Sequence, residues 1–168
     1  MVEFDVVELD ATDHPAAGEQ APDFTRPLVD GELWTDVSLS TLLDDGPLVL
    51  LFHPMDGAFP ATYAWNEIRE RGWTDEIAVV GLSISTPYEH KRLIEEREVD
   101  ARLFSDPGNG VAEKYDIVND LDGMAGVAEP RPAAFVVDAD GTIQYAWVAE
   151  EWPSFPDYDA IEAAIDEL

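Results

Sequence analysis

The side chains that most often do chemistry at neutral pH are scarce in this chain. Its 168 residues include three histidines, His14, His53 and His90, and no cysteine. Without cysteine there is no disulfide, no thiolate zinc site and no thiol nucleophile. The histidines lack the spacing of metal ligands, so we expect no metal and no cofactor. His53 directly precedes Pro54 and is predicted to form a wall of a pocket, with metal ligation as the alternative.

Other motifs of catalysis are also missing from the sequence. It has no nucleophile elbow, no P-loop and no G-x-G-x-x-G. Asp56 and Gly57 are predicted to form a turn rather than to act in acid–base chemistry. Thr62 could offer a hydroxyl to a pocket, although the start of a helix is the favoured role. Tyr63 and Trp65 are expected to be packing residues or dimer contacts.

The charge balance limits the partners of the protein. Nine Lys and Arg face 37 Asp and Glu, which gives a net charge of −28. Such a surface repels nucleic acid and anionic membranes, because both are bound through basic side chains. The acids are spread over the whole chain, which favours a solvated surface of halophilic type over an acidic site for a basic partner. No apolar run approaches the ~20 residues that span a bilayer, and the acidic start lacks a basic n-region, so we expect a soluble, cytoplasmic protein.

The residues around His53 are framed by a predicted β-α-β unit. The apolar run 48–53 is typical of a strand buried on both faces, and the next strand is expected at 77–84. Between them, a loop at 54–60 leads to a helix from about Ala61 to Arg71 that ends at Gly72. Pro60 lies just ahead of this helix, where a missing N–H has no cost.

The rest of the chain continues the alternation of strands and helices. Two extended segments are expected within 23–37, around a turn at 30–31, and a hairpin is expected at Asp138 to Gly141. The other predicted elements are helices at 38–45, 86–99, 110–115 and 157–168, strands at 102–104, 133–137 and 143–148, and a loop at 119–130. This pattern predicts an α/β fold with a mixed central sheet flanked by helices. We expect an acidic lead-in at 1–17, with a short strand within 2–9, and a single domain at 18–168.

Four segments in order resemble the peroxiredoxin family, of the alkyl hydroperoxide reductase and thiol-specific antioxidant type. They are the entry G-E-Q-A-P-D-F at 18–24, the strand and loop L-L-F-H-P at 50–54, the strand and helix at 81–91 with L-F-S-D-P at 103–107, and R-P-A-A-F-V-V-D at 131–138 followed by its hairpin. The match spans about residues 18–150. It implies a thioredoxin-like fold of peroxiredoxin type and a redoxin scaffold for the reduction of peroxides.

The resemblance also locates a missing active site. The family's loop reads P-x-x-x-T-x-x-C, and counting from Pro54 places Ala58 at the threonine and Ala61 at the peroxidatic cysteine. Pro54 is expected to form part of the site only by fixing the bend of the loop. In the family, a thiolate at the first turn of a helix is stabilised by free N–H groups and the helix dipole. The threonine hydroxyl helps to hold the peroxide in line for attack. Here both side chains are methyl groups, so this chain lacks the chemistry.

In the family, a nearby arginine lowers the pKa of the thiol further, and this arginine is displaced here as well. It usually lies three residues before the phenylalanine of its strand, where this chain has Pro132, and Arg131 comes one residue earlier. A slip of one residue on a regular strand turns a side chain to the opposite face. Pro132 could mark a bulge or strand start that aims Arg131 back into the pocket, which is our prediction. The alternative is a surface arginine.

Three interpretations of the function remain open. In the first, Ala61 replaces the only cysteine of a one-cysteine peroxidase, whose thiolate would attack the peroxide, form a sulfenic acid and need an external thiol reductant. In the second, the chain is a naturally non-catalytic relative that binds a partner, or a small anion at the helix N-terminus near Ala61. The third, a different enzyme without a thiol, has no sequence support. A homodimer is an option in each case, with Trp65, Trp73 and Trp152 available for an interface.

Overall fold

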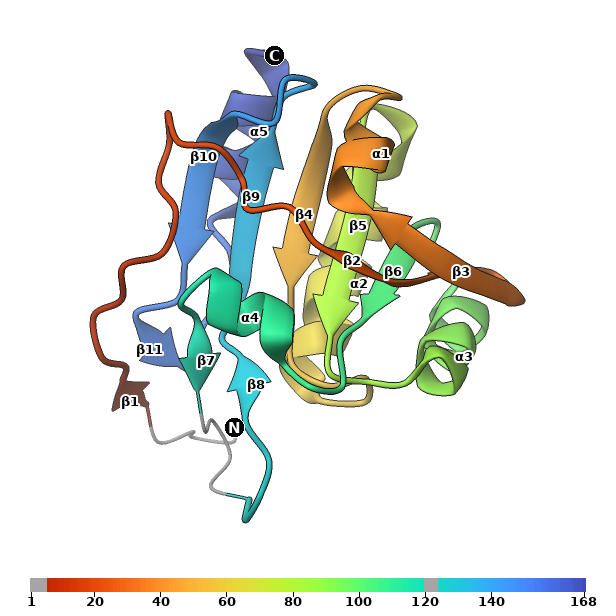
Figure 1. Cartoon of the computed structure of the whole chain (residues 1–168), viewed down its shortest axis with the longest axis vertical. Coiled ribbons are helices and arrows are strands. Elements are labelled where there is room, and N and C mark those ends of the chain that lie inside the picture. Colours follow the sequence, from red (N-terminus) through yellow and green to blue (C-terminus); the bar gives the residue numbers. More distant parts are fainter. Residues whose placement is uncertain (1–5, 120–123) are drawn as a thin grey trace.

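The computed structural model describes residues 6–119 and 124–168. Within them, the central sheet has seven strands in the order β10 (Ile143–Val148), β9 (Ala133–Val137), β4 (Leu48–Phe52), β5 (Ala78–Ser83), β6 (Arg102–Ser105), β2 (Thr25–Asp30) and β3 (Leu33–Ser38) (Figure 1). Strands β4, β5 and β6 are parallel, while β9, β10, β2 and β3 pair in antiparallel fashion. The predicted mixed sheet is therefore confirmed.

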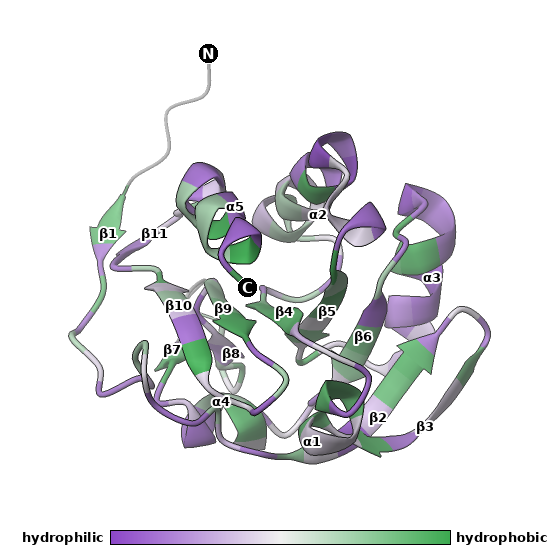
Figure 2. Ribbon diagram, turned by 90° about the horizontal axis from the view of Figure 1, so that it is seen from above, coloured by the Kyte–Doolittle hydropathy of each residue, from purple (hydrophilic) through white to green (hydrophobic). Residues whose placement is uncertain are grey.

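Helices cover both faces of this sheet (Figure 2). One face carries α2 (Phe59–Arg71), α3 (Pro87–Arg97) and α5 (Tyr158–Asp166), and the other carries α1 (Leu39–Leu43) and α4 (Gly110–Lys114). The alternation of side chains along each strand divides the apolar residues between the two faces. In β4, Leu50 and Phe52 pack with Tyr115 in the α1/α4 core, whereas Leu51 packs with Trp65 in the α2/α5 core. Such two-sided burial explains the uninterrupted apolar run of β4.

Helix boundaries follow local signals in most places. Helix α3 starts with a capping box, in which Thr86 and Glu89 bond each other's backbone N–H groups. Helix α2 ends as predicted at Gly72, which adopts the left-handed φ of 69° that glycine tolerates. Its start was predicted too late, because α2 begins at Phe59 and so includes Pro60 in its first turn. Proline is accepted there because the first N–H groups of a helix have no intrahelical partner.

Two short ribbons complete the fold. Strand β1 (Val7–Glu8) pairs with β11 (Glu151–Trp152), and β7 (Val118–Asn119) pairs with β8 (Glu129–Pro130). The segment predicted as a loop at 119–130 therefore has paired ends, although residues 120–123 lie outside the described part. Of the strand predicted within 2–9, residues 2–5 also lie outside the described part, and β1 covers residues 7 and 8.

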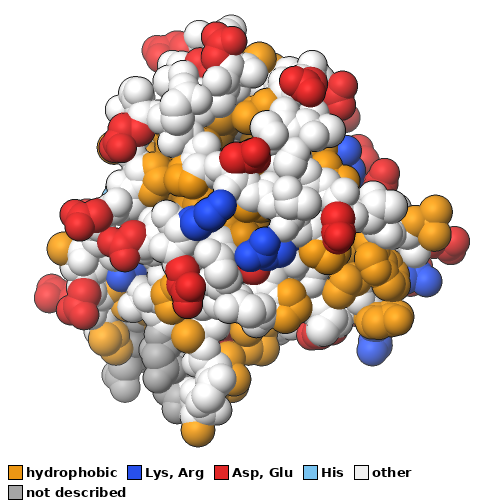
Figure 3. Space-filling view, viewed as in Figure 1, with side chains coloured by type: hydrophobic (Ala, Val, Ile, Leu, Met, Phe, Trp, Pro, Cys, Tyr) orange, Lys and Arg blue, Asp and Glu red, His pale blue; other side chains and the backbone are white. Residues whose placement is uncertain are grey.

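The surface carries the acidic charge that the composition predicts. Asp and Glu side chains are scattered over the face seen in Figure 3 rather than gathered in one patch. Among the helices of the described residues, none is both long and apolar enough to cross a membrane.

Candidate functional site

The loop at 53–58 lies where three parallel strands end. Strands β4, β5 and β6 run side by side in the same direction, so the residues that follow them meet at one edge of the sheet. In α/β sheets, ligands usually bind outside the carboxyl ends of the strands. The loop leads directly into α2, whose first turn holds position 61. The fold therefore places the predicted loop at the expected edge.

The three loop residues of the predicted site lie close to one another in the chain, and two of them are buried. Pro54 is buried in the loop, Ala58 is the N-cap of α2, and Ala61 is the third residue of that helix. Ala58 provides no side-chain cap, and Ala61 has 0% exposure. A cavity of about 230 Å³ between this loop and α3 includes Thr62 in its lining but not Ala61. A side chain at position 61 thus faces packed protein.

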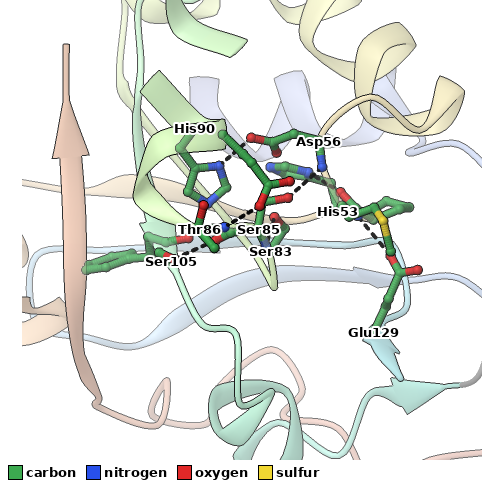
Figure 4. Close-up of polar contacts among 12 residues, drawn as sticks. His53, Asp56, Ser83, Ser85, Thr86, His90, Ser105 and Glu129 are labelled. Atoms are coloured by element: carbon green, nitrogen blue, oxygen red, sulfur yellow. Dashed lines mark hydrogen bonds and ion pairs between the residues drawn. The ribbon is translucent and has the colours of Figure 1, made fainter. Parts of the chain in front are cut away.

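Two buried polar side chains hold the loop backbone. The N–H of Met55 donates to a carboxylate oxygen of Glu129 at 2.8 Å, and the N–H of Asp56 donates to the hydroxyl of Ser85 at 2.8 Å. Glu129 and Ser85 are 1% and 2% exposed. Since hydrogen bonds gain strength away from water, both contacts fix the loop against the sheet (Figure 4).

A buried ion pair adds to this support. Nδ1 of His90 on α3 lies 2.7 Å from Oδ2 of Asp56, and the two side chains are 0% and 7% exposed. The other ring nitrogen, Nε2, donates to the carbonyl of Phe104 at 2.9 Å. A carbonyl can only accept, so Nε2 carries a hydrogen and one further proton is shared between Nδ1 and Asp56. Both nitrogens are engaged, which leaves His90 without a free site for acid–base catalysis.

His53 is a neutral, buried wall of this region. Its Nδ1 donates to the carbonyl of Pro54 at 2.7 Å, and the side chain is 1% exposed. Burial lowers the pKa of His53 to about 4, with a smaller lowering effect from His90 and an opposing effect from Asp56. Its Nε2 has no hydrogen-bond partner in the described part of the chain and lies against Gly81. His53 therefore presents a buried acceptor rather than a cation.

Arg131 lies in a different place from the three loop residues. Its Nε donates to Oδ1 of Asn119 at 2.7 Å, and its Nη1 donates to the carbonyl of Ala149 at 3.1 Å. It lines a cavity with residues 8–12 and 148–151, and none of Pro54, Ala58 or Ala61 contributes to that lining. No described hydrogen bond or shared cavity joins Arg131 to these three residues, so the expectation that Pro132 aims Arg131 into the pocket has no support from its contacts. A catalytic role for Arg131 stays a prediction.

The aromatic residues of α2 divide into core and surface. Trp65 is 2% exposed and packs in the α2/α5 core, edge-on to His53 with ring centroids 5.7 Å apart. Tyr63 is 57% exposed and meets Phe59 and Phe155, with centroids 5.8 and 6.1 Å away. Among the described residues, no cluster of three or more His, Asp or Glu is arranged to hold a metal ion.

Comparisons with known proteins place this geometry in a family. The model of the AhpC/TSA family matches residues 17–146. The chain belongs to the AhpC/TSA family. This peroxiredoxin-family chain is 28% identical over 141 residues to the chloroplastic 2-cysteine peroxiredoxin of Chattonella marina var. antiqua, covering 78% of this chain and 69% of that relative. It is 26% identical over 138 residues to the putative peroxiredoxin bcp of Coxiella burnetii, covering 77% and 86%.

Solved structures agree with this assignment. The crystal structure of peroxidoxin BcpB from Mycobacterium tuberculosis superposes with a TM-score of 0.74 at 25% identity, over 92% of this chain and 99% of that one. The thiol peroxidase from Chromobacterium violaceum gives a TM-score of 0.75 at 22% identity, over 92% and 88%. The predicted peroxiredoxin family and the thioredoxin-like fold of peroxiredoxin type are therefore confirmed.

Sequence reasoning missed the polar groups that support the loop. Asp56 does lie in the predicted turn, but its carboxylate also bonds to His90, 34 residues away. Glu129 reaches the loop from a strand 74 residues away. No local sequence pattern predicts such contacts. The position of Asp56, shortly after the end of a parallel strand, was a usable hint that its carboxylate lies at the edge of the sheet where sites form.

Proposed function

We propose that this AhpC/TSA-family protein is a non-catalytic peroxiredoxin-like binding protein. One observation carries the proposal: the loop and the helix start have neither the thiol nor the hydroxyl that peroxide reduction uses in this family, and no described hydrogen bond joins Arg131 to them. The thiol and hydroxyl positions are Ala61 and Ala58, and the described hydrogen bonds of Arg131 go to Asn119 and Ala149. A lost nucleophile alone would leave the hydroxyl and the arginine in place.

The burial of position 61 supports the same proposal. Attack on a peroxide requires the nucleophile and the peroxide oxygen to meet in line at about 3–3.5 Å. Ala61 is fully buried, and the loop ahead of it is held by Glu129, Ser85 and His90. A thiol at this position would be shielded from peroxide, and burial in apolar surroundings would raise its pKa.

A one-cysteine thiol peroxidase scaffold is the second candidate function. The order of the four family segments and the intact Pro54 favour it, and so does the total lack of cysteine, since removal of a single nucleophile would leave none. In that case a cysteine at position 61 would reduce a peroxide and be regenerated by an external thiol. The two candidates make opposite predictions for a restored thiol.

The test is the oxidation rate of Ala61→Cys with hydrogen peroxide in high salt, followed by the loss of titratable thiol in quenched, denatured samples. Ser40→Cys, at an exposed position of α1, provides the rate of an ordinary thiol in the same chain. We expect Ala61→Cys to react no faster than this control. A rate orders of magnitude higher would show that the loop still activates a thiolate, and the peroxidase scaffold would replace our proposal.

A second variant tests which missing group keeps a thiol at position 61 slow to oxidise. In Ala58→Thr/Ala61→Cys the hydroxyl and the thiol are both restored, while Arg131 stays where it is. We expect this variant to remain slow, because no cation lowers the pKa of the thiol. Fast oxidation of the double variant alone would mean that the hydroxyl was the only missing helper. Denaturation midpoints of all variants show whether each one is folded.

A further inference from the structure

Arg131 is the one buried side chain among the lysines and arginines of this protein. Nine Lys and Arg are present, all within the described residues, and Arg131 alone is buried, with 3% exposure. Its two hydrogen bonds go to neutral oxygens, those of Asn119 and Ala149. A guanidinium has five N–H donors, so three remain without a partner in the described part of the chain. Its donors are therefore only partly used.

This charge also lacks a carboxylate partner at contact distance. Of the ion pairs in the described part of the chain, none includes Arg131. Asp10 and Asp116 act on the guanidinium only from beyond that distance: burial lowers the pKa of Arg131, and the two carboxylates oppose this effect. Buried charges are normally paired at contact distance. A ligand with a carboxylate would supply that contact.

A cavity of about 410 Å³ adjoins the guanidinium. It lies between the N-terminal segment and the connection from β10 to β11, and two backbone contacts hold that segment in place. The N–H of Leu9 donates to the carbonyl of Glu150 at 2.9 Å, and the N–H of Asp13 donates to the carboxylate of Asp116 at 2.7 Å. The cavity is thus built by residues from both ends of the chain.

The polar groups that line the cavity differ between its buried part and its opening. Arg131 is buried at one side of the cavity, and the hydroxyl of Thr12, which also lines it, is a buried atom without a hydrogen-bond partner in the described structure. The acidic lining residues are all exposed, and they are Glu8, Asp10, Glu150 and Glu151. The cavity therefore offers donors in its buried part and carboxylates near solvent.

We propose that this cavity binds a small zwitterionic carboxylate, such as an α-amino acid. The ligand carboxylate pairs with the free N–H groups of Arg131 and accepts a hydrogen bond from Thr12, because guanidinium and carboxylate match in a two-bond geometry. The ammonium group points outward, to the carboxylates at the rim. This inference deepens the proposed binding function by naming a site and a ligand class, and it rests on that function.

The test is a titration of the unmodified chain in high salt, monitored by ¹H–¹⁵N NMR shifts, with three probes. L-alanine carries both charges, propionate lacks the ammonium and ethylammonium lacks the carboxylate. We expect L-alanine to bind with a Kd of about 1 mM or lower, and each of the other probes to bind at least about tenfold more weakly. No L-alanine binding up to about 10 mM would overturn the site, and equal binding of propionate would overturn the zwitterionic ligand.

Substitutions locate the bound ligand. Arg131→Gln is expected to weaken L-alanine binding by at least about tenfold, and Thr12→Val, which removes only the hydroxyl, by about five- to tenfold. Arg92→Gln on α3, whose side chain is 77% exposed, is the matched control and should have no effect. If Arg131→Gln does not fold, Thr12→Val still tests the site, because unchanged L-alanine binding by this variant would show that the ligand binds elsewhere. The oxidation assay is made on a thiol at position 61 and the titration on the unmodified chain, so the two proposals fail separately.

Discussion

Removal of the Asp56 carboxylate should destabilise the protein far more than removal of a surface carboxylate. In Asp56→Ala, His90 keeps its bond to Phe104 but loses its partner at Nδ1, while its exposure is 0%. Breaking a buried charge pair on one side costs about 3–5 kcal/mol. For a chain of this size that corresponds to a fall in Tm of roughly 6–20 °C. The loop ahead of Ala61 would lose one of its three side-chain anchors.

The assay is denaturant unfolding in high salt, which screens surface charges and leaves the buried pair almost unaffected. Asp159→Ala is the control. Like Asp56, Asp159 pairs with a basic side chain, that of Arg71 at 2.9 Å, but the side chain of Asp159 is 90% exposed. We expect that control to cost under about 1 kcal/mol. The double variant Asp56→Ala/His90→Leu should cost less than the sum of its single changes, since neither side chain of the pair is then left buried without the other. Equal losses for Asp56→Ala and Asp159→Ala would refute the reasoning.

Two further outcomes follow from His53 and its surroundings. The pKa of His53 is about 4 in the folded chain, below the ordinary 6.5, so between these pH values the unfolded chain binds a proton that the folded chain does not. The free energy of unfolding is therefore highest above pH 6.5 and falls by about 3 kcal/mol as the pH drops to 4. Comparison of unfolding free energies at several pH values with those of His53→Gln isolates this loss from the acidic surface, and parallel curves would contradict it. Gly81→Ala should cost about 1–3 kcal/mol, because a Cβ there would lie 2.5 Å from the ring of Trp65 and would also collide with Leu103. Gly108→Ala, with open space around its Cβ position, is the control. Equal unfolding midpoints for the two variants would show that the core rearranges to accept the methyl group at position 81.

Much of the fold could be predicted because its signals are local. The apolar run 48–53 and the hairpin at Asp138 to Gly141 carry strong short-range patterns, and both elements are present. The start of α2 was missed because Ala58 is not a capping residue, so the N-cap position gave no signal. The ribbon of β7 and β8 is two residues long, too short to give a periodic pattern.

The candidate site was predictable only in part. Motif spacing located Ala58 and Ala61, because the loop is continuous in sequence. The direction of Arg131 could not be settled, since Pro132 allowed either a regular register or a bulge. Its side chain bonds to Asn119 and Ala149 and lines a cavity with residues 8–12 and 14, and no local pattern links segments so far apart.

The apolar interior is divided between the two faces of the sheet, and the buried tryptophans lie on one face only within the described part of the chain. Trp65 and Trp73 are buried in the α2/α5 core and Trp147 packs against it, whereas the α1/α4 core contains no tryptophan among its described residues. Emission from these three tryptophans therefore reports on the face that carries α2, while the largest buried ring of the opposite face is that of Tyr115. An event confined to α1 and α4 would leave the emission nearly unchanged. Comparison of tryptophan emission with a backbone signal such as circular dichroism would show whether the two layers separate from the sheet together.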